Sequence, residues 1–254
     1  MIDLHTHVLP GIDDGPRDTE GAVALAARAA ADGVQVLAAT PHIRADHPDV
    51  RPEELGERAE HLRGALHAAG VAVEIVGGGE VDIYWAQSAT ADDLARVSYG
   101  QRGTDLLVET PYGALPERFE QLLFQLRARG MRLLLAHPER NPAFQEEPKR
   151  LAELVRQGVL LQVTASTLAS PKRRTHAFAR GLVREGLAHV IASDSHGAGL
   201  DRAGLTAGVA ALAGVAPRRA RWMVTEAPAA ILAGAPLPPP PRDRARRRAR
   251  WPRG

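Results

Sequence analysis

The chain opens with an apolar run, a His-x-His pair and a loop with two aspartates: Met1-Ile2-Asp3-Leu4-His5-Thr6-His7-Val8-Leu9-Pro10-Gly11-Ile12-Asp13-Asp14-Gly15. Residues i and i+2 of a β-strand point to the same face, so His5 and His7 would present two imidazoles side by side. Imidazole binds zinc, iron, manganese and similar divalent ions. An isolated pair can equally be two polar residues at a strand end. The interpretation therefore depends on whether the rest of the chain supplies further ligands.

Strands and helices alternate after this opening. Apolar runs that predict six further strands lie at 34–40, 71–76, 105–108, 132–136, 159–163 and 189–192. Segments that predict helices lie at 18–32, 52–69, 115–129, 149–157, 173–185, 203–213 and 217–233. Continuous apolar strands between helices are typical of a parallel sheet buried on both faces. The pattern therefore indicates an α/β fold with seven strands, either a closed barrel or an open doubly wound sheet.

The length and the charge distribution indicate one domain with a basic tail. A single α/β barrel of about 250 residues would use nearly all of the 254 residues. We expect the domain to span residues 1–235 and residues 236–254 to form a Pro/Arg-rich disordered tail, with its prolines as an extended spacer. Residues 242–254 carry seven arginines and one aspartate, a net charge of +6, which leaves −4 for residues 1–241 out of the total of +2.

Composition excludes several classes of function. The chain has no cysteine, so disulfides, thiolate ligands and a cysteine nucleophile are excluded. Aromatic residues make up 4% and the positive charge lies in the tail, so we expect no specific nucleic-acid binding. The start of the chain lacks the pattern of a signal peptide, and no apolar run approaches a membrane span of about 20 residues. We expect a cytoplasmic protein, with a tail that either binds anionic surfaces weakly or has no role.

Metal-capable residues stand at the ends of six of the seven predicted strands. They are His5 and His7, His42, Glu80, Glu109, His137, and Asp194 with His196. Catalytic residues of a parallel α/β barrel gather at this end of the strands. Singly, His42 could be a loop residue, Glu80 an exposed turn charge, and Glu109 and Asp194 helix caps. Jointly, the residues predict a polynuclear metal site.

The remaining histidines do not follow this rule. They lie in loops, on helices or at a strand start, and we interpret them as solvated or structural: His47, His61, His67, His176 and His189.

The ligand types indicate the chemistry of the predicted site. A mixed set of imidazoles and carboxylates suits Mn, Fe or Zn better than Mg or Ca. Clusters of two or more such ions polarise phosphoryl oxygens and activate water. Arg140, three residues after His137, could bind a phosphate beside the ions. Arg202, six residues after His196, could do the same or could be a solvated arginine at the start of a helix.

Five motifs together resemble the PHP (polymerase and histidinol phosphatase) superfamily: Asp3-Leu4-His5-Thr6-His7, Thr40-Pro41-His42, Gly79-Glu80, His137-Pro138-Glu139-Arg140 and Ser193-Asp194-Ser195-His196. Four further stretches narrow the resemblance: Leu9 to Pro16, Glu109-Thr110-Pro111-Tyr112, Gln162-Val163-Thr164-Ala165-Ser166 and Ala227-Pro228-Ala229-Ala230-Ile231-Leu232. With them, residues 1–235 are similar to the bacterial manganese-dependent tyrosine-protein phosphatases of capsule and exopolysaccharide gene clusters (CpsB/YwqE type).

The resemblance implies a single-domain distorted (β/α)7 TIM-like barrel, the PHP fold, that holds three divalent metal ions. Manganese is expected, with iron or zinc as alternatives. By position, one ion would be held by His5, His7, Glu109 and Asp194. Glu109 would bridge to a second ion that His137 also binds, and a third would be held by His42, Glu80 and His196.

The resemblance also assigns roles outside the ligand set. Arg140 would clamp the phosphate, with Arg202 as a second candidate, and Asp14 would stand beside the metals as an outer-sphere or proton-handling group. The implied activity is that of a protein-tyrosine phosphatase. The implied substrate is phosphotyrosine on the C-terminal tail of an autophosphorylating tyrosine kinase that controls polysaccharide export.

The chain departs from the family pattern at three places. Ile43 stands where many relatives have a second His, Asn141 replaces a common Tyr, and residues 168–178 lack an expected Gly-Phe-Gly-like segment. None of these removes a proposed ligand. Two alternatives stay open: a phosphatase of a small metabolite such as histidinol phosphate, and an inactive scaffold that only binds partners.

Overall fold

The strand pairings in the described part of the chain are all parallel. The computed structural model describes residues 1–171, 174–197 and 204–243. Its strands are β1 (Ile2–Thr6), β2 (Val36–Ala39), β3 (His42–Ile43), β4 (Glu74–Gly77), β5 (Glu80–Val81), β6 (Asp105–Val108), β7 (Arg132–Leu135), β8 (Leu160–Thr164) and β9 (Val190–Ala192). They pair in the orders β1-β2-β4 and β3-β5-β6-β7-β8-β9. Every register is parallel, as the continuous apolar runs predict.

The two sheets are parts of one ring of strands. β3 continues the path of β2 beyond Pro41, which has no N–H for the ladder, and β5 continues the path of β4 beyond Gly78 and Gly79. The first and last strands also meet, because His7 N donates to Ser195 O and Asp194 N donates to His5 O, both over 2.9 Å. The predicted α/β fold with parallel strands is thus confirmed, with the strands divided between two sheets.

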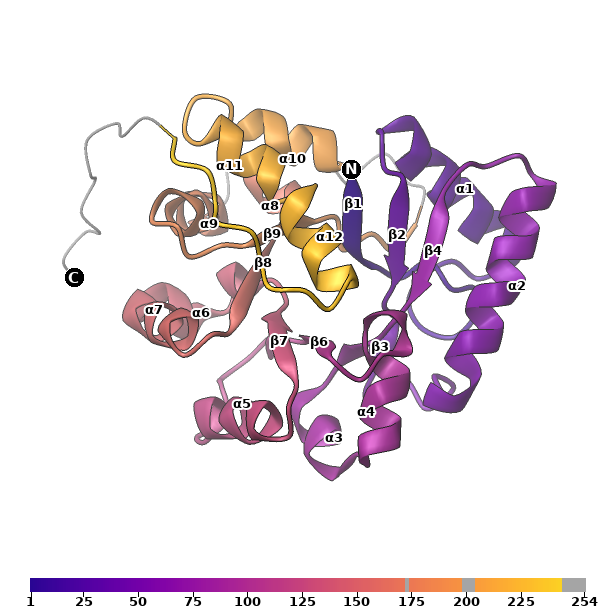
Figure 1. The fold of residues 1–254 in the computed structure, drawn as a ribbon, viewed down its shortest axis with the longest axis horizontal. Helices are drawn as coiled ribbons and strands as arrows, with labels where there is room; N and C mark the ends of the chain where they lie inside the picture. The colour runs from indigo at the N-terminus through magenta and orange to yellow at the C-terminus, as the bar shows by residue number, and fades with distance from the viewer. Residues whose placement is uncertain (172–173, 198–203, 244–254) are drawn as a thin grey trace.

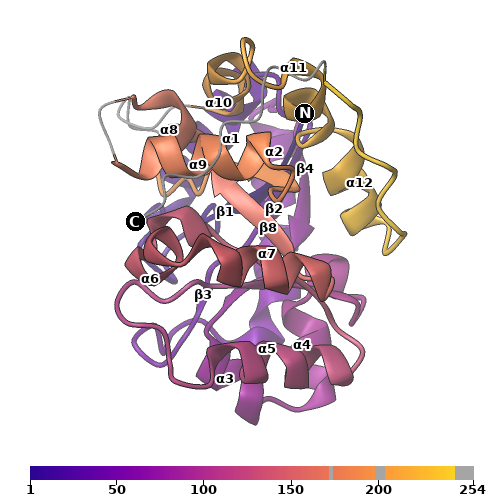
Figure 2. The same cartoon turned by 90° about the vertical axis from the view of Figure 1, so that its left-hand side faces the viewer.

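Helices surround the strands (Figure 1). They are α1 (Thr19–Ala31), α2 (Leu55–Ala68), α3 (Ile83–Ser88), α4 (Ala91–Val97), α5 (Phe119–Ala128), α6 (Pro142–Glu146), α7 (Pro148–Arg156), α8 (Ala165–Ala169), α9 (Arg174–Arg184), α10 (Leu205–Ala211), α11 (Pro217–Trp222) and α12 (Glu226–Leu232). Three 3₁₀ turns lie at Pro52–Glu54, Tyr99–Gln101 and Pro138–Arg140. Figure 2 looks onto α7 and α9 and shows β8 running behind them. None of the helices in the described ranges is long and apolar enough to cross a membrane.

Several helical regions differ from the prediction, which also lacked the short helices α6 and α8. No element was expected at 83–97, but α3 and α4 lie there, each capped by a side chain: Asp82 accepts from Tyr84 N, and Thr90 and Asp93 form a capping box. The single helix expected at 217–233 is two helices that are separated at residues 223–225. Pro228 explains the break, because proline is tolerated in the first turn of α12 but not inside a longer helix.

The apolar residues of each strand alternate between two buried layers. Leu107 and Leu134 belong to an inner cluster with Leu4, whereas their chain neighbours Leu106 and Leu133 belong to the outer cluster beneath the helices. This alternation follows from the two-residue period of a strand. Burial on both faces is the reason that the strands are continuously apolar in sequence.

The N-terminal ends of the strands are closed by the C-terminal part of the domain. Ile231 of α12 belongs to the inner cluster, and Leu237 packs against it. Arg132 pairs with Asp105 and donates from Nη1 to Ala235 O over 2.5 Å. Asp243 accepts hydrogen bonds from the backbone of Arg218 and Arg219. The predicted ligands therefore lie at the opposite end, and the arginine-rich residues 244–254 lie outside the described part of the chain.

His189, which precedes β9, gives a stability prediction. Its Nδ1 accepts from Leu161 N over 3.2 Å, and burial together with the charge of Arg219 lowers its pKa from 6.5 to about 4. The unfolded chain therefore binds a proton that the folded chain does not bind between these values, so this contribution is complete above pH 6.5 and is lost as the pH falls towards 4. As the pH falls from 6.5 to 4, the free energy of unfolding should therefore decrease less in His189→Asn than in the wild type, by up to about 3 kcal/mol.

Urea unfolding of both proteins from pH 4 to 7 measures this difference. Asp3, whose pKa burial raises to about 6, contributes an opposite slope, but it does so in both proteins and cancels in the comparison. Parallel curves of stability against pH for the wild type and His189→Asn would contradict the prediction.

Candidate metal centre

The eight predicted ligands converge at the C-terminal end of the strand ring. They come from six strand paths, and most are almost completely buried. Their donor atoms form overlapping groups in which all atoms lie within 4.8 Å of one another: His7 with Asp14, His42 and His196; His5 with His7 and Glu80; His5 with His137 and Asp194; and His42 with Glu80 and Glu109. The joint pattern of strand ends, rather than any single motif, was therefore the informative signal.

Two imidazoles and two carboxylates lie close together around His5 and His7. His5 Nε2 and His7 Nε2 lie 3.3 Å apart. Glu80 Oε2 lies 3.3 and 3.6 Å from these two nitrogens, and Asp194 Oδ1 lies 3.3 and 3.5 Å from them. His5 and His7 thus lie next to both carboxylates, in the mixture of imidazole and carboxylate donors that divalent transition metals bind.

The tautomers of the two imidazoles support the same conclusion. His5 Nδ1 donates to Gln162 Oε1 over 3.1 Å, and His7 Nδ1 donates to Asp13 Oδ2 over 2.7 Å. With Nδ1 donating in both rings, the two Nε2 atoms face each other, an arrangement that is favourable only around a shared proton or cation. A ligating histidine commonly donates its other nitrogen to a carboxylate or carbonyl oxygen in this way.

Glu80 occupies the middle of the cluster. Its Oε1 lies 2.9 Å from His137 Nε2, and its Oε2 lies 3.1 Å from His42 Nδ1. Burial alone would raise the pKa of Glu80, but the charge of His5 and hydrogen bonds from His137 and His42 hold it well below its ordinary value. Glu109 lies at the side, with Oε2 4.0 Å from His42 Nδ1. Glu80 therefore lies closer to the imidazoles than Glu109, which the resemblance places as the bridge between two ions.

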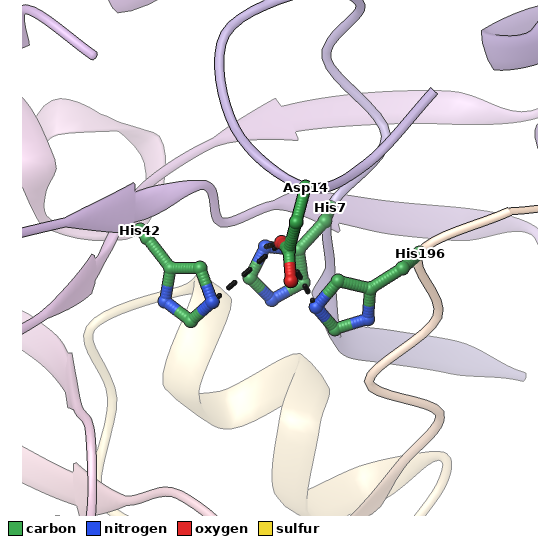
Figure 3. A group of neighbouring side chains, drawn as sticks. All are labelled: His7, Asp14, His42 and His196. Atoms are coloured by element: carbon green, nitrogen blue, oxygen red, sulfur yellow. Dashed lines mark ion pairs between the residues drawn. The ribbon is translucent and has the colours of Figure 1, made fainter. Parts of the chain in front are cut away.

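Asp14 lies among three imidazoles at the mouth of the cluster (Figure 3). Its Oδ1 lies 3.2 Å from His196 Nε2, 3.7 Å from His42 Nε2 and 3.8 Å from His7 Nδ1. These are spacings of a further candidate ligand, whereas the outer-sphere position expected for Asp14 is held by its neighbour Asp13. The Asp14 side chain is 55% exposed, so it is also the carboxylate of the centre that faces solvent.

A tight loop orients the side chains of the adjacent Asp13 and Asp14 in different directions. Gly11 N donates to Pro16 O over 2.8 Å, and Gly15 N donates to Asp13 Oδ1 over 3.0 Å. A Cβ atom at Gly15 would lie 2.1 Å from the carbonyl oxygen of His7, so only glycine allows this close approach. The loop thereby turns Asp13 inward beneath His7 and leaves Asp14 at the mouth.

Arg140 lies at the rim of the cluster, as predicted. His137 has a left-handed backbone, with φ 36° and ψ 46°, and leads into the 3₁₀ turn Pro138–Arg140. Arg140 Nη1 lies 2.6 Å from Asp194 Oδ2, and its Nη2 donates to Thr164 Oγ1 over 3.0 Å. The guanidinium is thereby fixed beside the ligands. The second candidate, Arg202, lies outside the described residues.

Four side chains of the centre were not predicted as site residues. Gln162 joins His5 to His137, because its Oε1 also accepts from His137 N over 3.2 Å; its signal was a polar residue inside an apolar strand. Arg44 Nη1 lies 2.7 Å from Glu109 Oε1. The ring of His47, which was interpreted as solvated or structural, stacks on that of His42 with centroids 5.0 Å apart. Asp13 is the fourth, and no motif in the sequence distinguishes it from Asp14.

The electrostatics of the cluster favour positive charge. Burial alone would lower the pKa of His7, but hydrogen bonds to Asp13 and Asp194 and the charge of Glu80 raise it to about 10. The pKa of Asp194 is likewise held well below its ordinary value, against the effect of burial, by His5, His7 and Arg140. The buried Nδ1 of His137 has no hydrogen-bond partner among the described residues. Bound cations would satisfy both the charge and this open valence.

Several known proteins are similar in sequence to this chain over most of its length. The chain is 34% identical over 199 residues to tyrosine-protein phosphatase YwqE of Bacillus subtilis (strain 168), with 77% of each protein covered. It is 29% identical over 197 residues to putative tyrosine-protein phosphatase CapC of Staphylococcus aureus, again with 77% of each covered. It is 28% identical over 211 residues to tyrosine-protein phosphatase CpsB of Streptococcus pneumoniae, covering 77% of this chain and 83% of CpsB.

Solved structures agree with the sequence comparison. One from work on YwqE of Bacillus subtilis and CpsB of Streptococcus pneumoniae, described as unique metal-dependent tyrosine phosphatases, superposes with a TM-score of 0.85 at 30% identity, over 96% of this chain and 100% of that one. A β-aspartyl dipeptidase from Fervidobacterium islandicum AW-1, at 16% identity and a TM-score of 0.54 over 91% of this chain and 74% of that one, shares the fold alone. The profile of the family "Capsular polysaccharide synthesis, CpsB/CapC" matches residues 1–231. The chain belongs to the CpsB/CapC family.

Proposed function

We propose that this protein is a metal-dependent phosphatase that hydrolyses phosphotyrosine in proteins. The observation that carries the proposal is the buried cluster around Glu80, with the guanidinium of Arg140 fixed beside Asp194 at its rim. Such a cluster binds divalent cations, and an adjacent arginine binds a phosphoryl group. Membership of the CpsB/CapC family supports the same activity, since YwqE, CapC and CpsB are all named tyrosine-protein phosphatases.

The donor set fits three divalent ions, for which manganese is our first choice and iron or zinc are the alternatives. We assign the first to His5, His7, Glu80 and Asp194, and a second to Glu80, Glu109 and His137. The third would be held by Asp14, His42 and His196. In this assignment Glu80, rather than Glu109, is the shared carboxylate. When bound, such ions polarise phosphoryl oxygens and activate water for attack.

The chain's own groups would position the substrate and its charges. The guanidinium of Arg140 presents several N–H donors in one plane, which matches the oxygens of a phosphoryl group and stabilises charge that develops on them. Thr164 and Asp194 hold the guanidinium in place from either side. Asp14, whose side chain is the exposed carboxylate of the centre, would hold its ion at the mouth, where the substrate arrives.

The physiological substrate follows from the family. Its members are described by capsular polysaccharide synthesis, so we propose that the substrate is the phosphorylated C-terminal tail of a tyrosine autokinase that regulates capsule or exopolysaccharide synthesis. We place the reaction in the cytoplasm, with which a chain that lacks cysteine is compatible. The arginine-rich residues 244–254 have no part in the proposed reaction.

The first prediction concerns metal dependence. A phosphotyrosine peptide should be hydrolysed by the purified protein, and activity should be lost on chelation and restored by added Mn²⁺. His137→Ala should reduce kcat/KM by at least about 100-fold, because it removes a donor 2.9 Å from Glu80. His61→Ala, on the exposed face of α2, is the matched control. Full activity in a metal-stripped sample would overturn the proposal, as would a much higher kcat/KM for histidinol phosphate than for the peptide.

The second prediction separates substrate binding from metal binding. Arg140→Ala should lower kcat/KM for the peptide by about 10²–10³-fold, which is the effect of removing one donor to the developing charge. Arg140→Lys should recover only part of this loss, because it keeps the charge but not the planar fork. Arg156→Ala, on the outer face of α7, serves as the control. If Arg140→Ala instead left kcat/KM within twofold of the wild type, Arg140 would have no role in phosphate binding.

The third prediction concerns the outer support of the centre. Gln162→Leu removes the acceptor for His5 and His137 and should weaken metal affinity by about 10–100-fold. Gln162→Glu, which keeps an acceptor, should retain most of the affinity. Competition with a fluorescent chelator measures the affinity, and circular dichroism confirms folding. Unchanged affinity in Gln162→Leu would show that this side chain does not orient the ligands; Gln157→Leu, at an exposed position, is the control.

A further inference from the structure

An exposed aromatic ring stands at the mouth of the candidate centre. Within the described ranges, the large apolar side chains with high exposure are Tyr84, Tyr112 and Phe124, and Tyr112 is 62% exposed. Tyr84 and Phe124 lie on α3 and α5, outside the strand ring (Figure 1). Tyr112 instead follows β6 and Glu109, and its ring stacks on His137 with centroids 5.9 Å apart and an interplanar angle of 28°. The exposed ring of Tyr112 therefore borders the donor groups of the candidate centre.

The backbone on both sides of Tyr112 is fixed by one side chain. Asn141 Nδ2 donates to Pro111 O over 2.7 Å and to Gly113 O over 3.0 Å. Asn141 Oδ1 accepts from Ala143 N, which caps α6, and the side chain is almost completely buried. The loop that carries Tyr112 is therefore held in place although the ring itself is open to solvent.

The same short segment holds the ring and the phosphate-binding arginine. Asn141 directly follows Arg140 at the end of the 3₁₀ turn, so the two residues move as one piece of backbone. His137, on which the ring of Tyr112 stacks, leads into the same 3₁₀ turn as Arg140. A phosphoryl group on Arg140 would thus have an aromatic surface within reach of whatever the phosphate is attached to.

We propose that Tyr112 determines specificity for aryl phosphates, because its ring packs against the aromatic ring of phosphotyrosine while Arg140 binds the phosphate. Asn141 is the positioning residue that sets the ring at this place. The inference rests on the proposed phosphatase activity and adds a residue that selects its substrate. Packing of two aromatic rings contributes about 0.5–1.5 kcal/mol beyond area burial. An alkyl phosphate such as phosphoserine offers no ring for this contact.

Two peptides of the same sequence, one with phosphotyrosine and one with phosphoserine, test the proposal on the metal-loaded full-length protein. Tyr112→Ala should raise KM for the phosphotyrosine peptide about 3- to 10-fold and lower the ratio of kcat/KM between the two peptides by the same factor. Tyr112→Phe keeps the ring and should restore the ratio. Phe124→Ala, which removes an exposed ring of similar size far from the mouth, should leave the ratio at the wild-type value.

Asn141→Ala tests the positioning role. It should lower the same ratio, and the double variant with Tyr112→Ala should lower it little further, because both changes remove one interaction. Thermal unfolding and metal content check that each variant folds and binds ions. Full additivity of the two losses would overturn the role of Asn141.

The outcomes separate this inference from the proposed function. If wild-type protein hydrolyses the phosphotyrosine peptide but Tyr112→Ala leaves the ratio unchanged, or lowers both rates equally, Tyr112 does not select aryl phosphates. If wild-type protein with full metal content fails on the phosphotyrosine peptide, the proposed function itself is overturned, and this inference with it.

Discussion

The charged end of this protein is arranged around a single carboxylate, that of Glu80. Glu80 is completely buried and lies within about hydrogen-bond distance of imidazoles from three different strand paths. A buried anion is unfavourable unless cations compensate it. Here the compensation comes from histidines, one of which has its pKa raised to about 10. The same buried carboxylate also attracts divalent cations. The group that the histidines stabilise in the fold is therefore the group that the proposed catalysis needs.

The ring of parallel strands makes this convergence feasible. Because every strand points the same way, the residues that follow their C-terminal ends meet at one end of the ring. The opposite end is filled by Tyr99, whose hydroxyl donates to Leu4 O, and by Ile231 of α12. The apolar lower part and the charged upper part are thus separated along the strands. Contacts between β1 and β9, at the very residues that carry His5, His7 and Asp194, complete the ring.

Sequence patterns predicted the parts of this site that depend on strand ends alone. Each of the eight ligand candidates follows an apolar run, and the structure brings all of them together. The grouping was not predictable, because the choice between Glu80 and Glu109 as the central carboxylate depends on how far each strand extends across the ring. Asp13 and Asp14 have the same side chain, and only the turn around Gly15 places one beneath His7 and the other at the mouth. Helices α3 and α4 were missed although the Thr90–Asp93 capping box was legible in the sequence.

The proposed metal centre requires that Glu80 is a ligand shared by two ions. Anomalous diffraction at the manganese edge, from crystals of the full chain grown with Mn²⁺, measures this directly. We expect a strong peak among His5, His7, Glu80 and Asp194, and a second peak on the other side of the Glu80 carboxylate, towards His137 and Glu109. The absence of any peak among these side chains, or peaks bridged by Glu109 with Glu80 directed away from both ions, would contradict the account.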